Sequence, residues 1–287
     1  MVFRDMGCAL FFLKKCRKLQ IIQKEVITMK KILSLLLAAT VLFCCFGITA
    51  FADEATATIY VSIADKGNLK VAYEAVTVTD IDNDGALTVN DALYAAHEET
   101  YSGGAAAGYS FYTHEDYGLC IGKLWGDTSG NFGYYLNNAS CWSLSDTVKD
   151  GDSLYAFVYK DGKFFSDKYS FFDKNTVSGE DGEEVTLTLT CAGYDPVTWA
   201  PVTLPVAGAM ITVDGEETGI TTDANGCATI TLEAGEHVIS ATSASETLVP
   251  PVCIADIEGG FDILSIIRSI IEKIVDAVKL IINLFVK

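Results

Sequence analysis

The segment that most constrains the fold of this chain is the acidic run from Asp80 to Asp91, which reads Asp-Ile-Asp-Asn-Asp-Gly-Ala-Leu-Thr-Val-Asn-Asp. A Ca²⁺ ion takes about six to eight oxygen ligands, and a loop of about twelve residues can supply them if a glycine makes the sharp turn. Gly85 stands at that turn. The ligand positions are then Asp80, Asp82, Asp84, the backbone carbonyl of Ala86, Thr88 and Asp91. Because carboxylates recur at these offsets, a calcium loop is favoured over an ordinary polar turn.

The spacing resembles an EF-hand, and more closely its dockerin variant, in which the loop ends on Asp and runs directly into a helix that begins Asp-Ala-Leu. Asp91-Ala92-Leu93 matches that start. The pattern therefore predicts a helix over about Asn90 to Tyr101. Dockerins generally carry a repeated loop, whereas this chain has a single copy, so a cohesin-type partner is disfavoured. The loop is more typical of a structural clasp.

Residues 1–52 have the features of a leader followed by a secretory signal peptide. Met29-Lys30-Lys31 gives a basic start, an apolar run follows, and Ala50-Phe51-Ala52 provides small residues at a cleavage site. We therefore expect a secreted or extracellular protein, or one associated with a bacterial cell surface.

The chain of 287 residues carries a formal net charge of −18. Nucleic-acid binding requires a positive surface, so that function is excluded. The cysteines beyond the signal segment include no Cys-x-x-Cys pair, and a zinc or thioredoxin-type site has no support. Their number is odd and their disulfide pairing is left open: Cys120, Cys141, Cys191, Cys227 and Cys253.

Residues 53–173 are predicted to form an α+β domain rich in antiparallel strands. Apolar residues alternate over Ala57 to Ala64, as in a half-buried strand, and Lys66-Gly67-Asn68 makes a hairpin turn. Beyond Tyr109 the chain is aromatic and interrupted by turns, which indicates further short antiparallel strands.

This region resembles the transcobalamin C-terminal-like domain in its secreted bacterial form. The matching features are Gly133-Tyr134-Tyr135-Leu136-Asn137-Asn138, Lys149-Asp150-Gly151-Asp152 and Ala156-Phe157-Val158-Tyr159. The resemblance implies capture of a small, corrinoid-like ligand. Nothing in the chain reads as the helical barrel that accompanies this domain in transcobalamin-like proteins.

Residues 174–184 are rich in glycine and acidic residues, and this composition predicts a linker. Residues 185–257 are predicted to form an all-β sandwich. The turns Val213-Asp214-Gly215 and Thr221 to Gly226 resemble those of bacterial immunoglobulin-like and carboxypeptidase-regulatory-like domains, which are spacers or binding modules.

Residues 261–287 are predicted to form a C-terminal amphipathic helix, because polar residues recur in a heptad rhythm along an apolar segment. The apolar face of this helix must be buried, and three ways remain open: docking on the sandwich, self-association with other copies, and contact with a membrane surface.

Enzymatic motifs are weak. Ser140-Cys141-Trp142 echoes a papain-like nucleophile segment, but the Gly-rich approach to the cysteine is missing and no helix is expected after it. Trp125, Tyr134, Tyr135 and Trp142 are candidates for an aromatic platform that binds a flat or sugar ligand, but core and cross-strand packing is the favoured interpretation. The sequence therefore predicts a non-enzymatic, calcium-stabilised binding or adhesion protein whose partner is an unidentified protein or small molecule.

Overall fold

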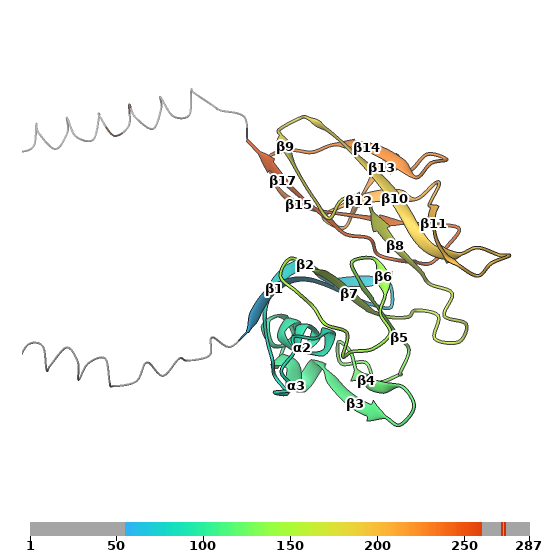
Figure 1. The fold of residues 1–287 in the computed structure, drawn as a ribbon. Coiled ribbons are helices and arrows are strands. Elements are labelled where there is room, and N and C mark those ends of the chain that lie inside the picture. Colours follow the sequence, from blue (N-terminus) through green and yellow to red (C-terminus); the bar gives the residue numbers. More distant parts are fainter. Residues whose placement is uncertain (1–54, 260–270, 272, 274–287) are drawn as a thin grey trace, which may run out of the picture. The chain divides into compact units, whose positions relative to one another are not determined.

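The computed structural model describes residues 55–259, together with Ile271 and Lys273 (Figure 1). Its first sheet has the strand order β2-β1-β7-β5-β6. The strands are β1 (Thr56–Asp65), β2 (Asn68–Thr79), β5 (Phe132–Leu136), β6 (Ala139–Ser140) and β7 (Ser153–Val158). The predicted hairpin between β1 and β2 is confirmed, since the two strands pair antiparallel from Asp65 and Asn68 at the turn to Thr56 and Thr79.

Helix α2 (Val89–Thr100) covers one face of this sheet (Figure 1). The helix buries Val89, Leu93 and Ala96 at helical spacing, and these side chains share a core with Ile59 and Val61 of β1. The predicted helix over about 90–101 is therefore confirmed. It is followed by the short helix α3 (Gly104–Gly108), where the sequence predicted only a helix end.

Helix α2 is also fixed to the chain that follows it through His97, which is fully buried. The ring Nδ1 donates to the Leu93 carbonyl at 2.7 Å, and Nε2 accepts from the Trp125 backbone N–H at 3.1 Å. Trp125 follows the two-stranded ribbon of β3 (Ser110–His114) and β4 (Gly118–Lys123).

The expectation that the strands between residues 109 and 172 are antiparallel is wrong for β7, and also for β8 (Lys168–Phe172), which pairs parallel with β16 (Leu248–Val249). Strand β7 lies between β5 and β1, and it pairs antiparallel with β5 but parallel with β1. For β7 the reason is topological. The chain leaves the sheet after β2 through α2 and the ribbon and re-enters it at β5, which runs opposite to β1. It then reverses direction, so β7 runs parallel to β1. The first sheet is therefore mixed.

The later part of the chain is an all-β sandwich, as predicted. One sheet has the order β11-β10-β8-β16, with β14 also paired to β10, and the other has the order β13-β12-β15-β17-β9. Leu189 of β10 and Ile211 and Ile239 of the second sheet are buried in a common core. The strands are β8 (Lys168–Phe172), β9 (Thr176–Glu180), β10 (Glu184–Tyr194), β11 (Pro201–Pro205), β12 (Met210–Val213), β13 (Glu216–Thr221), β14 (Cys227–Thr231), β15 (Gly235–Thr242), β16 (Leu248–Val249) and β17 (Cys253–Glu258).

The linker predicted at residues 174–184 is corrected by the structure, because most of it is strand. Strand β9 pairs in parallel with β17 and forms an edge of the second sheet. Its side chains alternate between exposed and half-buried, and Val177 packs against the sandwich core. Because an edge strand tolerates glycine and acidic residues, the composition of this segment is similar to that of a linker.

Strand β8 also crosses the boundary predicted at residue 173. It pairs with β10 and β16 of the sandwich, and Phe172 lies in the sandwich core. The second face of the first sheet contributes Ala64, Tyr155 and Phe157 to a third core, which they share with Tyr169 and Val252. The described residues 55–259 accordingly belong to one compact unit.

All five cysteines in the described part of the chain are free thiols, and Cys191 and Cys253 are buried. No helix within residues 55–259 is long and apolar enough to span a membrane. The predicted leader and signal peptide (1–52) lies outside the described residues, and so does the predicted amphipathic helix (261–287), apart from Ile271 and Lys273.

Candidate metal centre

The acidic loop connects β2 to α2, and both of its ends are anchored in the first core. Val78, near the end of β2, and Val89, at the start of α2, are buried in the same cluster. Thr88 is the N-cap of α2, with its side chain accepting a hydrogen bond from the Asp91 backbone N–H. The loop therefore spans two elements whose positions are set by packing.

The loop turns back on itself through hydrogen bonds to carboxylates. The Asp80 side chain accepts from the backbone N–H groups of Asp84 at 3.1 Å and Gly85 at 2.8 Å. The Asp84 side chain accepts from the Ala86 N–H at 2.8 Å. Gly85 has a φ of 89°, a conformation that side chains rarely adopt, which explains why glycine stands at the turn.

Three of the predicted ligands gather at one point. Asp80, Asp82 and Asp84 each place a carboxylate oxygen within 4.8 Å of the others. Asp80 is half-buried, whereas Asp82 and Asp84 are exposed. Oxygen atoms at this spacing on an open loop form the kind of ligand group that Ca²⁺ or Mg²⁺ binds.

Thr88 and Asp91 make a different set of contacts. The Asp91 carboxylate is buried and accepts from the Thr88 N–H at 2.8 Å and the Thr88 hydroxyl at 2.6 Å through Oδ2. Its Oδ1 accepts from the Ile81 N–H at 3.1 Å. The Thr88 N–H contact, together with the donation of the Asp91 N–H to the Thr88 side chain, forms a capping box at the start of α2. The Ile81 contact ties the beginning of the loop to the same carboxylate. Asp91 therefore organises the loop and the helix together, and its carboxylate is not one of the three that gather.

Asn90 belongs to this region although its spacing gave no reason to select it. The fully buried Asn90 side chain donates weakly to Asp82 at 3.5 Å and accepts from the Tyr109 hydroxyl at 2.9 Å. It thereby connects the loop to the chain beyond α3. The only sequence signal for Asn90 was that a polar residue stands next to the last loop position, Asp91. That signal does not predict the contact with Tyr109.

The carboxylates of the loop differ in their electrostatic surroundings. Desolvation by the surrounding loop, together with the negative charges of Asp84, Asp91 and Asp80, raises the pKa of Asp82 above its ordinary value. Hydrogen bonds from backbone N–H groups, the strongest from Gly85, hold the pKa of Asp80 below its ordinary value. A divalent cation among these carboxylates would replace repulsion by attraction and favour the charged form of each.

The other residues considered for chemistry do not assemble a site. Burial raises the pKa of the Cys141 thiol to about 12, the opposite of an activated nucleophile. The four aromatic residues are dispersed. Trp125 and Tyr134 pack against the first core, Tyr135 stacks on Tyr169 in the third core, and Trp142 is 94% exposed.

No protein-family model matches this sequence, and no curated protein matches it. Two solved structures similar to the chain are the ectodomain of the teleost fish polymeric Ig receptor and the N-terminal four Ig domains of Dscam1 isoform 4.44. The receptor is 11% identical, with 53% of this chain and 73% of that chain covered and a TM-score of 0.18. The Dscam1 structure is also 11% identical, with 71% and 44% covered and a TM-score of 0.21. At these TM-scores the assignment of the fold rests on the strand pairing and cores described above.

Proposed function

We propose that this chain is a secreted, non-enzymatic binding protein whose helix and first sheet are joined by a calcium-stabilised loop. The observation that carries the calcium site is the meeting of the Asp80, Asp82 and Asp84 carboxylates within 4.8 Å. The Ala86 carbonyl and water molecules are the natural further ligands, since Ca²⁺ takes about six to eight oxygens.

The role of the ion is structural. Helix α2 begins with its own capping box and packs into the first core, and neither set of contacts uses the Asp80, Asp82 and Asp84 carboxylates. Binding would therefore order the loop and stabilise the junction between β2 and α2. A sensor would instead need an element that changes position when the ion binds.

Two observations favour a binding protein over an enzyme. The Cys141 thiol has a pKa raised by burial, and both ring nitrogens of His97 are engaged in buried hydrogen bonds. The resemblance to the transcobalamin C-terminal-like domain and the predicted signal peptide remain the reasons for proposing an exported protein. Corrinoid capture and action through residues 261–287 stay predictions of the sequence.

Isothermal titration calorimetry of Ca²⁺ into the calcium-free full-length chain tests the site. We expect binding at one site, with a Kd that rises at least tenfold in Asp82→Asn, because the substitution removes one charged ligand. Asp116→Asn is the matched control, since Asp116 is an exposed acid outside the loop. Absence of binding, or an equal loss in both variants, would contradict the proposed site.

A further inference from the structure

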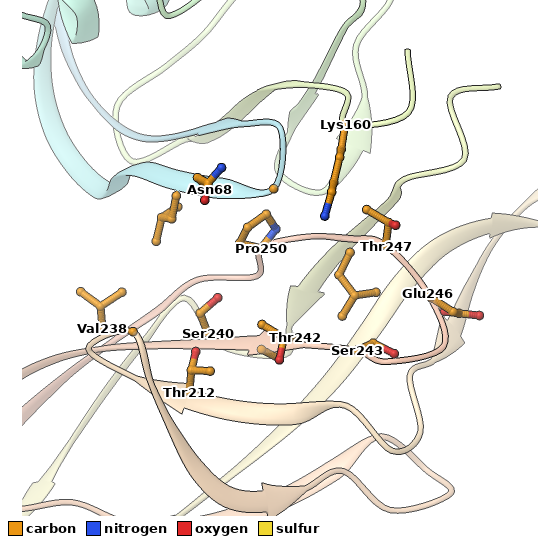
Figure 2. A pocket seen from close by; sticks show the side chains of 15 residues that line it. Asn68, Lys160, Thr212, Val238, Ser240, Thr242, Ser243, Glu246, Thr247 and Pro250 are labelled. Carbon is orange, nitrogen blue, oxygen red and sulfur yellow. The ribbon is translucent and has the colours of Figure 1, made fainter. Parts of the chain in front are cut away.

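A cleft of about 460 Å³ lies between the β1–β2 turn and the outer face of the second sandwich sheet (Figure 2). Its first wall consists of Gly67, Asn68 and Leu69 at the turn, with Lys160 beside them, and its floor is formed by β12 and β15. This volume lies in the range of about 300–1,000 Å³ in which small-molecule sites fall.

The floor of the cleft is a group of hydroxyl side chains. Thr212 and Ser240 face each other across the antiparallel pairing of β12 and β15, and Thr242 lies two residues further along β15. Their neighbours Ile211, Ile239 and Ala241 point the other way, into the sandwich core. Figure 2 shows the Thr212 and Ser240 side chains directed toward the cleft.

The Thr212 hydroxyl has no hydrogen-bond partner among the described residues, although the Thr212 residue is only 6% exposed. In the same part of the chain, the one fully buried side-chain oxygen without a partner is Oδ1 of Asp65. The Thr212 hydroxyl must therefore be reached from the cleft. A hydroxyl that opens into a cleft, with both its donor and its acceptor capacity unused, can bond to a polar ligand.

The charge of the cleft comes from Lys160. Its ammonium group makes no ion pair with a described residue, whereas Glu246 on the rim pairs with Lys168. Figure 2 shows the Lys160 side chain extending toward Pro250 and Thr247. Lys160 is the one basic residue among those that line the cleft, and its ammonium group favours an anionic ligand.

A peptide strand is disfavoured as the occupant. Strands β12 and β15 both lie inside their sheet, between β13 and β17, so their backbone groups are already paired. A peptide adds to a sheet through free backbone groups at an edge. The cleft instead offers side-chain hydroxyls, one ammonium group and the oxygen of the Asn68 amide, whose nitrogen donates within the turn to the Asp65 and Lys66 carbonyls. These groups suit a ligand rich in hydroxyl groups.

We propose that this cleft binds an acidic saccharide, whose carboxylate pairs with Lys160 while its hydroxyl groups bond to Thr212 and Ser240. The proposal names a ligand class for the binding role proposed above, and it does not depend on the calcium loop.

Calorimetry of the full-length chain with trigalacturonate tests this proposal in a buffer without added calcium. We expect one site, with a Kd raised about tenfold by Lys160→Gln and about tenfold by Thr212→Val, since each removes a hydrogen-bonding group. Lys149→Gln and Thr203→Val are matched controls at exposed positions outside the cleft, and both should leave the Kd unchanged. Thermal melts verify that each variant folds, and Ser240→Ala replaces Thr212→Val if the latter does not.

Two further ligands separate the contributions of charge and hydroxyl groups. Neutral maltotriose should bind at least tenfold more weakly than trigalacturonate, and the difference should disappear in Lys160→Gln. Tricarballylate, which has carboxylates without sugar hydroxyls, should also bind at least tenfold more weakly. The proposal is overturned if trigalacturonate does not bind, if the control variants lose as much affinity, or if tricarballylate binds equally well. The Kd for trigalacturonate should be the same in Asp82→Asn as in the parent chain. A failure of the saccharide proposal can therefore be distinguished from a failure of the calcium site.

Discussion

The Nε2 atom of His97 lies 3.1 Å from the backbone nitrogen of Trp125 and accepts its hydrogen, so the buried imidazole is neutral with its proton on Nδ1. Burial lowers the pKa of His97 from 6.5 to about 4. The ring stacks on Tyr109 and contacts Trp125, with ring centroids 5.1 and 5.5 Å away. This one side chain thus couples α2 to the segments that follow it.

Protonation of His97 should destabilise the fold in acid. Because the folded-state pKa lies below the unfolded value of 6.5, the unfolded state binds the proton more readily. The stabilising effect is complete above pH 6.5 and is lost as the pH falls toward 4, with a loss of about 3 kcal/mol at the lower end. Urea unfolding at pH 7, 5.5 and 4.5 measures it. His97→Gln should flatten this dependence, and His114→Gln should not. An equal slope in all three proteins would contradict the assignment.

His237 should show the opposite behaviour. Its Nδ1 lies 2.8 Å from the Asp214 carboxylate and its Nε2 lies 2.9 Å from the Glu233 carbonyl, so both nitrogens face acceptors. The Asp214 hydrogen bond is the main reason that the pKa of His237 is raised above 6.5. Its stabilising effect is present below pH 6.5 and is lost as the pH rises through the folded-state pKa. An NMR titration should give a His237 pKa above 6.5 that falls in Asp214→Asn. An unchanged pKa in that variant would rule out the pairing.

In calcium-free buffer, mutations should show that the capping box stabilises the fold and that the acidic cluster does not. Thr88→Ala removes the N-cap side chain and should cost about 1 kcal/mol of unfolding free energy. Asp82→Asn should instead leave stability unchanged or increase it, because it relieves repulsion from the neighbouring carboxylates. Denaturant unfolding with EDTA measures both effects. A large loss of stability in Asp82→Asn would show that its carboxylate supports the fold without a metal.

The Tyr155 hydroxyl should contribute to the stability of the whole described unit. It is buried and donates to the Pro250 carbonyl at 2.5 Å, across the third core. Tyr155→Phe leaves that carbonyl without its partner and should cost about 1–3 kcal/mol. Tyr117→Phe, at a position 73% exposed, is the control. Urea unfolding should show a lower midpoint for Tyr155→Phe alone, and equal midpoints would contradict the role of this contact.

Local patterns predicted the hairpin and the helix well. The alternation from Ala57 to Ala64 and the turn at Gly67 are short-range signals, and the start of α2 was indicated by Asp91-Ala92-Leu93. The gathering of Asp80, Asp82 and Asp84 followed from spacing as well. In each case the residues that determine the structure are neighbours in the chain.

What the sequence did not reveal depends on long-range pairing. Strand β9 is held by β17, which is far away in the chain, so its glycine and acidic residues resembled a linker. The parallel pairing of β7 with β1 depends on a crossover that no local pattern encodes. The Asp91 carboxylate fitted a metal ligand by spacing, but its hydrogen bonds to Thr88 and Ile81 depend on the way the loop closes.

The most direct test of the calcium-stabilised loop is a thermal melt of the full-length chain in 1 mM Ca²⁺ and in EDTA. For a Kd about a hundredfold below the calcium concentration, binding adds about 2.7 kcal/mol, which corresponds to a rise of roughly 5–10 °C in Tm. Asp80→Ala should abolish this difference. An identical Tm in calcium and in EDTA, with Asp80→Ala melting like the parent chain, would contradict the account.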